Sequence, residues 1–121
     1  MFELRRSFRF DAAHTLIRSI AADKSRRIHG HSYKAEITLR GAPDPASGMI
    51  MDLGALDQRL QGVRDALDHR FLDDIPALGP ATLENLALWI WHQLKPQIPR
   101  LSRVTVMREA SGDACSYEGE E

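Results

Sequence analysis

Apolar and polar side chains alternate strictly over residues 33–40, and this pattern constrains the fold more than any other part of the chain. The apolar members are Tyr33, Ala35, Ile37 and Leu39. Since successive side chains of a β-strand point to opposite faces, the alternation predicts a strand with one face packed on a core. The strand begins at His29-Gly30-His31, so the two histidines are expected to project from one face.

Three more segments are predicted to be strands. Residues 2–10 carry apolar side chains at even positions, and residues 104–109 also alternate. A Gly112-Asp113 turn then leads into a short last strand near Tyr117. Residues 15–28 have no clear period and carry several charges, so we expect a loop there.

Two helices are predicted between the second and third strands. Asp52 is suited to cap the first, because its carboxylate can accept a hydrogen bond from a backbone N–H of the first turn. Thr82 caps the second in the same way, and that helix ends at Pro96. The first helix has its apolar residues on one side: Leu53, Leu56, Leu60, Val63 and Leu67.

The element order is strand, strand, helix, helix, strand, strand, within a single domain of residues 1–121. This ββααββ order predicts an α+β fold, an antiparallel four-stranded sheet with two helices on one face. Such a sheet leaves two strand edges without partners, and joining the sheets of several copies into a closed barrel would pair them. We therefore expect a homo-oligomer.

The charge balance excludes some classes of partner. Sixteen Lys and Arg residues face seventeen Asp and Glu residues, a net charge of −1, which gives no general attraction to nucleic acid or to a membrane. The N-terminus has no apolar run, so we expect neither a signal peptide nor a membrane span. The single cysteine, Cys115, can form no internal disulfide, which fits a reducing cytoplasm.

Three histidines, His14, His29 and His31, are candidate metal ligands. Three neutral imidazoles suit zinc and leave a fourth position for water or substrate, which is typical of a catalytic site. A purely structural zinc site is disfavoured because it normally has four protein ligands. On spacing alone, a pair of strand histidines plus an unrelated core histidine remains the alternative.

Other polar residues each allow two interpretations. Asp68-His69 is either a carboxylate that orients an imidazole for proton transfer or a helix-end histidine that complements the helix dipole. Glu109 either pairs with a cation or binds a ligand with adjacent N–H donors. Thr82 and Glu84 either cap a helix or leave its N–H groups free for a ligand. The basic residues within 24–27 either hold a phosphorylated substrate or form a solvated surface.

Six motifs occur in a fixed order along nearly the whole chain. They are Phe10-Asp11-Ala12-Ala13-His14, His29-Gly30-His31, Gly48-Met49-Ile50-Met51-Asp52, Leu67-Asp68-His69, Thr82-Leu83-Glu84-Asn85 and the single residue Glu109. In this order they resemble one family, the 6-pyruvoyl-tetrahydropterin synthase and 6-carboxy-tetrahydropterin synthase group. The Cys115-Ser116-Tyr117 ending and the compact length look more like its bacterial 6-carboxy branch.

The resemblance implies the tunnelling fold, in which trimeric rings of joined sheets stack into a homohexamer with active sites between subunits. It implies 7,8-dihydroneopterin triphosphate as the substrate and Zn²⁺ as the cofactor. The zinc would be held by His14, His29 and His31, and it would polarise the hydroxyls of the substrate side chain.

The same resemblance implies roles for five further residues. Glu109 would anchor the pterin ring through its N–H groups, helped by Thr82 and Glu84. Asp68 and His69 would form part of a proton-transfer relay.

The chain departs from the family pattern at Ser25. The usual general base of the family is a cysteine four residues before the His-Gly-His, and that position is Ser25 here. A free thiol titrates near ~8.5, whereas a serine hydroxyl is a far weaker acid that needs an adjacent base. Either Ser25 is an engineered change, or His69 or another group replaces the thiol, or the protein binds pterins without the usual turnover. Cys115 is a substitute thiol or, more simply, a small, partly buried hydrophobe.

The sequence therefore predicts a zinc-dependent lyase of the 6-carboxy-tetrahydropterin synthase type, which feeds queuosine synthesis. One alternative is the pyruvoyl-forming reaction, which eliminates triphosphate but keeps the side-chain carbons. The other is a zinc-containing pterin-binding protein with little activity, motivated by Ser25.

Overall fold

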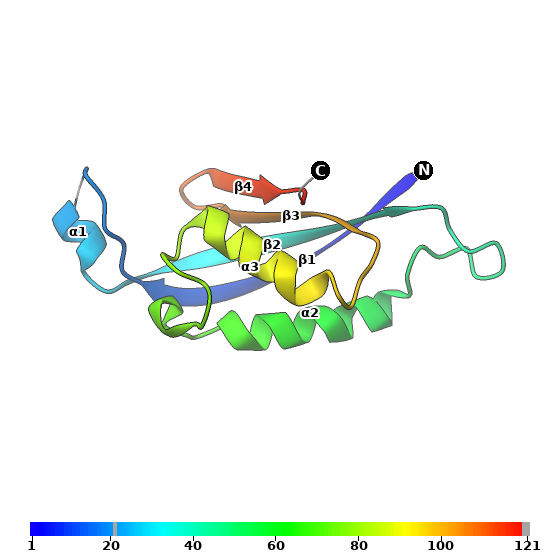
Figure 1. Ribbon diagram of the computed structural model, residues 1–121, viewed down its shortest axis with the longest axis horizontal. Helices are drawn as coiled ribbons and strands as arrows, with labels where there is room; N and C mark the ends of the chain where they lie inside the picture. Colours follow the sequence, from blue (N-terminus) through cyan, green and yellow to red (C-terminus); the bar gives the residue numbers. More distant parts are fainter. Residues whose placement is uncertain (21, 120–121) are drawn as a thin grey trace.

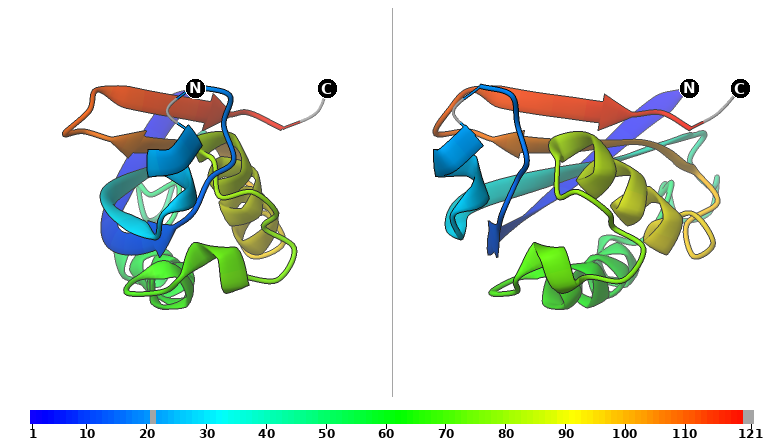
Figure 2. Two further views of the ribbon diagram at one scale, coloured as in Figure 1. Left: turned by 90° about the vertical axis from the view of Figure 1, so that its left-hand side faces the viewer. Right: turned by 60° about the vertical axis from the view of Figure 1, so that its left-hand side comes forward.

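A four-stranded antiparallel sheet with strand order β1-β2-β3-β4 forms the centre of the computed structural model, which describes residues 1–20 and 22–119 (Figure 1). The strands are β1 (Phe2–His14), β2 (His29–Gly41), β3 (Leu101–Arg108) and β4 (Asp113–Tyr117). Two helices, α2 (Leu53–Leu67) and α3 (Leu83–Leu94), lie against one face of the sheet (Figures 1 and 2). The predicted ββααββ order is confirmed.

Two short elements add to this order. The loop predicted over residues 15–28 contains a helix, α1 (Ala22–Arg26), and a 3-10 turn, η1 (Leu72–Asp74), follows α2. The prediction of a loop is therefore wrong over α1. A helix of five residues is too short to produce the repeating apolar pattern from which helices are recognised in sequences.

The first strand is longer than predicted, because β1 continues past residue 10 to His14. Its last residues pair with the start of β2, and its other edge contacts the segment after α2. The backbone N–H of Ala13 donates to the carbonyl of Arg70 (3.0 Å), and that of His69 donates to the carbonyl of Asp11 (2.7 Å). These hydrogen bonds hold the end of β1 in an extended conformation without help from an apolar pattern.

The core lies between the sheet and helices α2 and α3, and it confirms the alternation of β2. Tyr33 is 2% exposed, and the next three odd residues of the strand are fully buried. Helix α2 buries four of its five predicted apolar residues, whereas Leu53 in its first turn is 46% exposed. Leu53 follows a connection whose residues are mostly exposed, so the apolar side of the helix begins one turn later.

The third strand begins earlier than predicted, at Leu101, and it ends one residue earlier, at Arg108. Glu109 lies in the turn between β3 and β4, where the backbone N–H of Gly112 donates to the carbonyls of Arg108 (3.0 Å) and Glu109 (3.3 Å). Gly112 has a φ of 78°, a conformation that residues with a Cβ rarely adopt. The need for a residue without a Cβ at this φ places the turn at Gly112.

Both predicted helix caps are confirmed. The Asp52 carboxylate accepts from the backbone N–H of Ala55 (3.0 Å), and the Thr82 hydroxyl accepts from that of Asn85 (3.1 Å).

We expect Asp52→Ala to lower the free energy of unfolding by about 1 kcal/mol, because the first turn of α2 loses its capping acceptor. Urea denaturation would measure the change. Asp65→Ala, which removes an exposed carboxylate from the last turns of the same helix, is the matched control and should have a smaller effect. An equal loss of stability in the two variants would contradict a specific capping role.

The outer edge of β4 has no strand partner within the described residues, so the closed barrel of several copies stays a prediction. Among residues 1–20 and 22–119, no helix is both long and apolar enough to cross a membrane.

Candidate functional site

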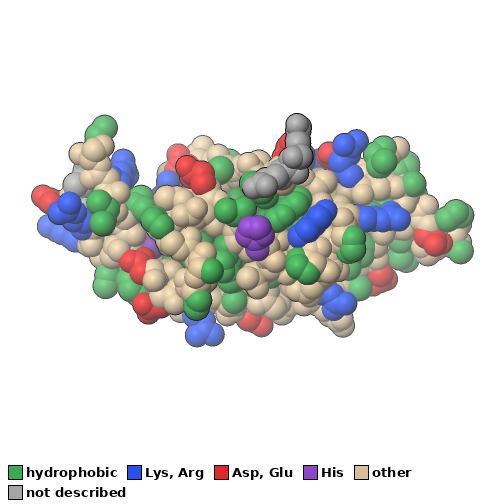
Figure 3. Space-filling model, viewed as in Figure 1, with side chains coloured by type: hydrophobic (Ala, Val, Ile, Leu, Met, Phe, Trp, Pro, Cys, Tyr) green, Lys and Arg blue, Asp and Glu red, His purple; other side chains and the backbone are tan. Residues whose placement is uncertain are grey.

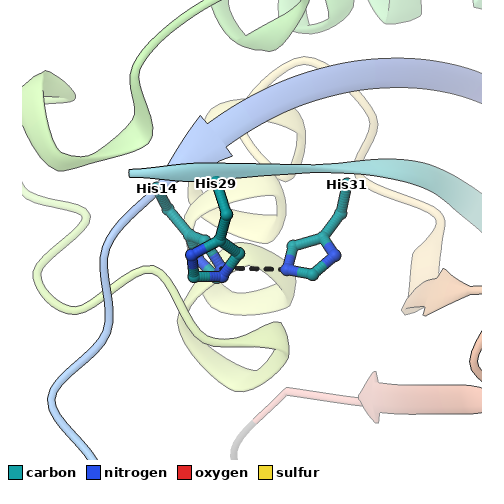
Figure 4. Close-up of side chains that lie close together, drawn as sticks. All are labelled: His14, His29 and His31. Atoms are coloured by element: carbon teal, nitrogen blue, oxygen red, sulfur yellow. Dashed lines mark hydrogen bonds between the residues drawn. The ribbon is translucent and has the colours of Figure 1, made fainter. Parts of the chain in front are cut away.

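The three candidate histidines lie together where β1 ends and β2 begins (Figure 4). His14 is directly opposite His29 in the strand register, and His31 is opposite Ala12. The Nε2 atom of His14 is 2.9 Å from that of His29 and 3.1 Å from that of His31. The predicted common face of His29 and His31 is thus found, and cross-strand pairing adds His14 to it.

Backbone contacts fix which nitrogen of two of these rings carries the proton. His14 Nδ1 is 2.9 Å from the carbonyl of Ala81, and His29 Nδ1 is 2.7 Å from the carbonyl of Arg27. Because a carbonyl only accepts, each Nδ1 must be the donor, and each neutral ring then presents an Nε2 lone pair to the cluster.

These lone pairs fit a metal ion. Two Nε2 lone pairs that face each other at 2.9 Å repel unless a cation or a proton lies between them. Tetrahedral zinc with bonds of 2.0–2.1 Å would place its ligand nitrogens about 3.3 Å apart, close to the observed separations. The carbonyl contacts at Nδ1 are those that orient metal-binding histidines. His14, His29 and His31 could therefore hold a metal ion.

Burial favours the uncharged form of two of the three histidines. It lowers the pKa of His14, and it lowers that of His31 to about 4, with the Arg108 guanidinium as the second cause at His31. Neutral imidazoles are the form that binds metal, so the lowered pKa values of His14 and His31 favour metal binding.

The metal-free protein should lose stability as the pH falls from about 6.5 toward 4. In this window the unfolded chain protonates His31, whose ordinary pKa is 6.5, while the folded chain resists protonation until about pH 4. Stability is therefore full above 6.5 and declines on acidification. Urea midpoints of chelator-treated protein at several pH values would measure this, and His31→Gln should flatten the decline. A pH profile unchanged by that substitution would contradict the assignment.

A pocket of about 370 Å³ opens beside the histidines. Ser25, on α1, lines it and is 6% exposed, so the position of the family cysteine is buried against the cluster. Thr82 and Glu84, at the start of α3, line the same pocket. The structure thus brings Ser25, Thr82 and Glu84 to the histidines.

Three other predicted site residues lie elsewhere. His69 does not line the histidine pocket; it lines a second depression with Asp11 and Ser32, and His31 borders both. It contacts its neighbour Asp68 (Nδ1 to Oδ2, 2.9 Å), because α2 has ended and the backbone has turned, with a φ of 58° at His69. The Asp68 pKa is lowered, first by the backbone N–H of Asp11 and then by the His69 imidazole. The pair is preformed, but neither residue lines the histidine pocket of its own chain.

Glu109 is the third of these residues, and its carboxylate pairs with the guanidinium of Arg9. It does not line the histidine pocket of its own chain. Of the two sequence interpretations, pairing with a cation is the one seen in the isolated chain.

Cys115 gives little support to the idea of a substitute thiol. It is partly buried on β4, and burial, followed by the Glu84 carboxylate, raises the pKa of its thiol. A raised pKa reduces the thiolate fraction at neutral pH.

The basic residues before the histidine pair, Lys24, Arg26 and Arg27, are all exposed. Figure 3 shows Lys and Arg side chains together with hydrophobic ones at the end of the molecule formed by α1. The exposure of these three residues fits their interpretation as a solvated surface. The same helix, α1, reaches the pocket through Ser25.

Sequence reasoning did not assign several residues of the pocket to a site, and Tyr33 and Arg108 are among them. Tyr33 was assigned to the core, and its ring also packs edge-on to His31 at 5.8 Å between centroids, while burial raises its pKa to about 12. In β3, Arg108 occupies the next even position after Val104 and Val106. A charged residue where the alternation calls for an apolar one is the signal that could have pointed to it.

The fold and the site define a small α+β protein with a three-histidine cluster able to hold a metal ion in a pocket beside its sheet. A sequence model described as 6-pyruvoyl tetrahydropterin synthase matches residues 3–120. The chain belongs to this family of pterin synthases.

Relatives agree along the chain. The 6-pyruvoyl tetrahydrobiopterin synthase of Homo sapiens is 32% identical over 134 residues, covering 98% of this chain and 92% of the human one. The Dictyostelium discoideum protein of the same name is 35% identical over 96 residues, covering 76% and 71%. The structure of Caenorhabditis elegans 6-pyruvoyl tetrahydropterin synthase superposes with a TM-score of 0.85 at 30% identity, covering 98% of this chain and 96% of that one.

Proposed function

We propose that the protein is a zinc-dependent lyase that eliminates triphosphate from 7,8-dihydroneopterin triphosphate and forms 6-pyruvoyl-tetrahydropterin. The observation that carries the proposal is the convergence of three imidazole Nε2 atoms in a pocket that Ser25 also lines. Membership of the family and the names of the relatives support the substrate class.

The pyruvoyl product replaces the 6-carboxy product favoured by the sequence. The 6-carboxy expectation depended on the Cys115-Ser116-Tyr117 ending and on chain length. The similar proteins described above carry the pyruvoyl name, and one of them is covered over 92% of its length. The 6-carboxy reaction, with its place in queuosine synthesis, becomes the alternative.

In the proposed mechanism, His14, His29 and His31 would hold the zinc, and the zinc would supply a Lewis acid able to acidify the substrate side-chain hydroxyls and the adjacent C–H. Ser25 lines the same pocket, and its hydroxyl could relay a proton only if another group accepted it. Glu84 also lines this pocket and is a candidate acceptor.

The relay of Asp68 and His69 would serve the pocket of a neighbouring copy, since it lies outside the pocket of its own chain. This placement fits the expected homohexamer, a dimer of trimers with sites between subunits.

A zinc-containing pterin-binding protein with little turnover is the second candidate, and Ser25 favours it. A serine hydroxyl, unlike a thiol, forms no significant fraction of anion near neutral pH without help.

Mass spectrometry of the products formed by zinc-loaded protein from 7,8-dihydroneopterin triphosphate tests the proposal. A 6-pyruvoyl product would support it, whereas a 6-carboxy product would move the protein to the other branch. Unchanged substrate that is nevertheless bound would favour the binding protein.

Glu109→Gln should weaken pterin affinity roughly tenfold or more, because hydrogen bonds from the pterin N–H groups to a charged acceptor would be lost. The quenching of pterin fluorescence on binding would measure the dissociation constant. Glu3→Gln is the matched control, since Glu3 also pairs with an arginine but on another part of the sheet. Unchanged affinity in Glu109→Gln would remove this residue from the site.

A further inference from the structure

Arg108 places a guanidinium directly beside the histidine cluster. Its Nη1 atom is 3.3 Å from His31 Nε2, and its side chain lines the same pocket as Ser25 and Glu84. None of the family motifs found in the sequence includes this residue.

The β3–β4 hairpin holds this guanidinium in place. Arg108 Nη2 donates to Asp113 Oδ2 at 2.6 Å, and the two residues are paired in the strand register. The Ser111 hydroxyl donates to the same carboxylate oxygen at 3.0 Å. Because the acceptor is itself fixed, the guanidinium is oriented before any ligand arrives.

Two donor atoms of Arg108 have no oxygen acceptor within the described residues. Nε is buried without a hydrogen-bond partner, and Nη1 contacts only the imidazole nitrogen of His31. Buried donors are normally paired, so these atoms indicate a missing acceptor. The imidazole cannot be a lasting one, because the same lone pair faces the proposed metal position.

An oxygen anion of a bound ligand would satisfy both cations. It would accept from the guanidinium on one side and face the metal on the other, whereas a neutral or cationic group there would leave the two positive charges opposed. A planar guanidinium fixed by a carboxylate is suited to oxyanions.

We propose that Arg108 is a substrate-binding residue that receives an oxyanion of the pterin side chain next to the metal, and this inference rests on the proposed function. The oxyanion is either a phosphate of the triphosphate group or an ionised side-chain hydroxyl. Both groups offer Arg108 an anionic oxygen, and they differ in whether the ligand must carry phosphate to bind there.

Fluorescence titration of the zinc-loaded protein with neopterin and with neopterin triphosphate, both stable oxidised pterins, tests the proposal. The variants are Arg108→Gln and Arg108→Lys. Arg103→Gln is the matched control, because it removes one positive charge from the same strand at a residue that contacts Glu3 and Glu118 instead. Zinc content and thermal unfolding are measured on each variant to check that it keeps its fold and its metal.

We expect Arg108→Gln to weaken binding roughly tenfold or more, with Arg108→Lys intermediate and Arg103→Gln unchanged. Weakening for neopterin triphosphate alone identifies a phosphate as the anion, and equal weakening for both ligands identifies a side-chain oxygen. Equal affinities in Arg108→Gln and Arg103→Gln would overturn the proposal.

Failure of the proposed function has a different signature. If the parent protein binds zinc but neither pterin, the substrate assignment fails. Inorganic phosphate then replaces the pterins as the probe: a loss of phosphate affinity specific to Arg108→Gln supports the oxyanion site, and no such loss overturns it.

Discussion

Replacing His29 by alanine should remove zinc from the protein and abolish turnover. His29 supplies one of three converging nitrogens, and its ring is oriented by the carbonyl of Arg27 (2.7 Å). Loss of an outer contact of this kind costs about 10–100-fold in metal affinity, and loss of the ligand itself should cost more. With two imidazoles left, the zinc would exchange freely into buffer.

Elemental analysis after dialysis against a weak chelator measures this effect directly. His92→Ala is the matched control, because it removes an exposed histidine of α3 that lies outside the pocket. Full zinc content in His29→Ala would exclude the ligand assignment, and zinc loss in both variants would indicate general destabilisation instead.

Ser25→Cys should raise turnover by about 100-fold, the second large effect. Ser25 is 6% exposed and lines the pocket of the histidines, so a thiol there would meet the substrate side chain. A thiol with a pKa of about 8.5 ionises readily beside a cation, whereas a serine hydroxyl does not. General base catalysis typically contributes a factor of about 10²–10⁴.

Steady-state rates of triphosphate release from pH 6 to 9 would measure the gain, and an ionisation absent from the parent should appear in the profile. Ser116→Cys adds a thiol on exposed β4 and controls for nonspecific thiol chemistry. No gain from Ser25→Cys would mean that another group is the base, and Glu84 would then be the first to replace.

Local patterns predicted the parts of the fold that depend on local contacts. The alternation of residues 33–40 predicted the strand β2 and the face of it that is buried, and the caps at Asp52 and Thr82 are hydrogen bonds within one helical turn. The common face of His29 and His31 follows from the same strand periodicity. These features need no knowledge of the rest of the chain.

Features set by distant contacts could not be predicted in this way. The pairing of His14 with His29 depends on strand register between two segments. Spacing alone left an unrelated core histidine as the alternative, and the family resemblance favoured the shared site. The placement of Asp68-His69 outside the pocket depends on where α2 ends against β1. Arg108 was missed because its role arises from a hairpin that turns its guanidinium toward another strand.

The carbonyl of Ala81 that holds His14 belongs to the residue just before Thr82. A single peptide unit therefore connects His14, a ligand of the proposed metal position, to the start of α3, where Thr82 and Glu84 line the pocket. A ligand that shifted this segment would therefore also shift the carbonyl that orients His14. Any effect of the ligand on metal affinity through this contact must be matched by an equal effect of the metal on ligand affinity.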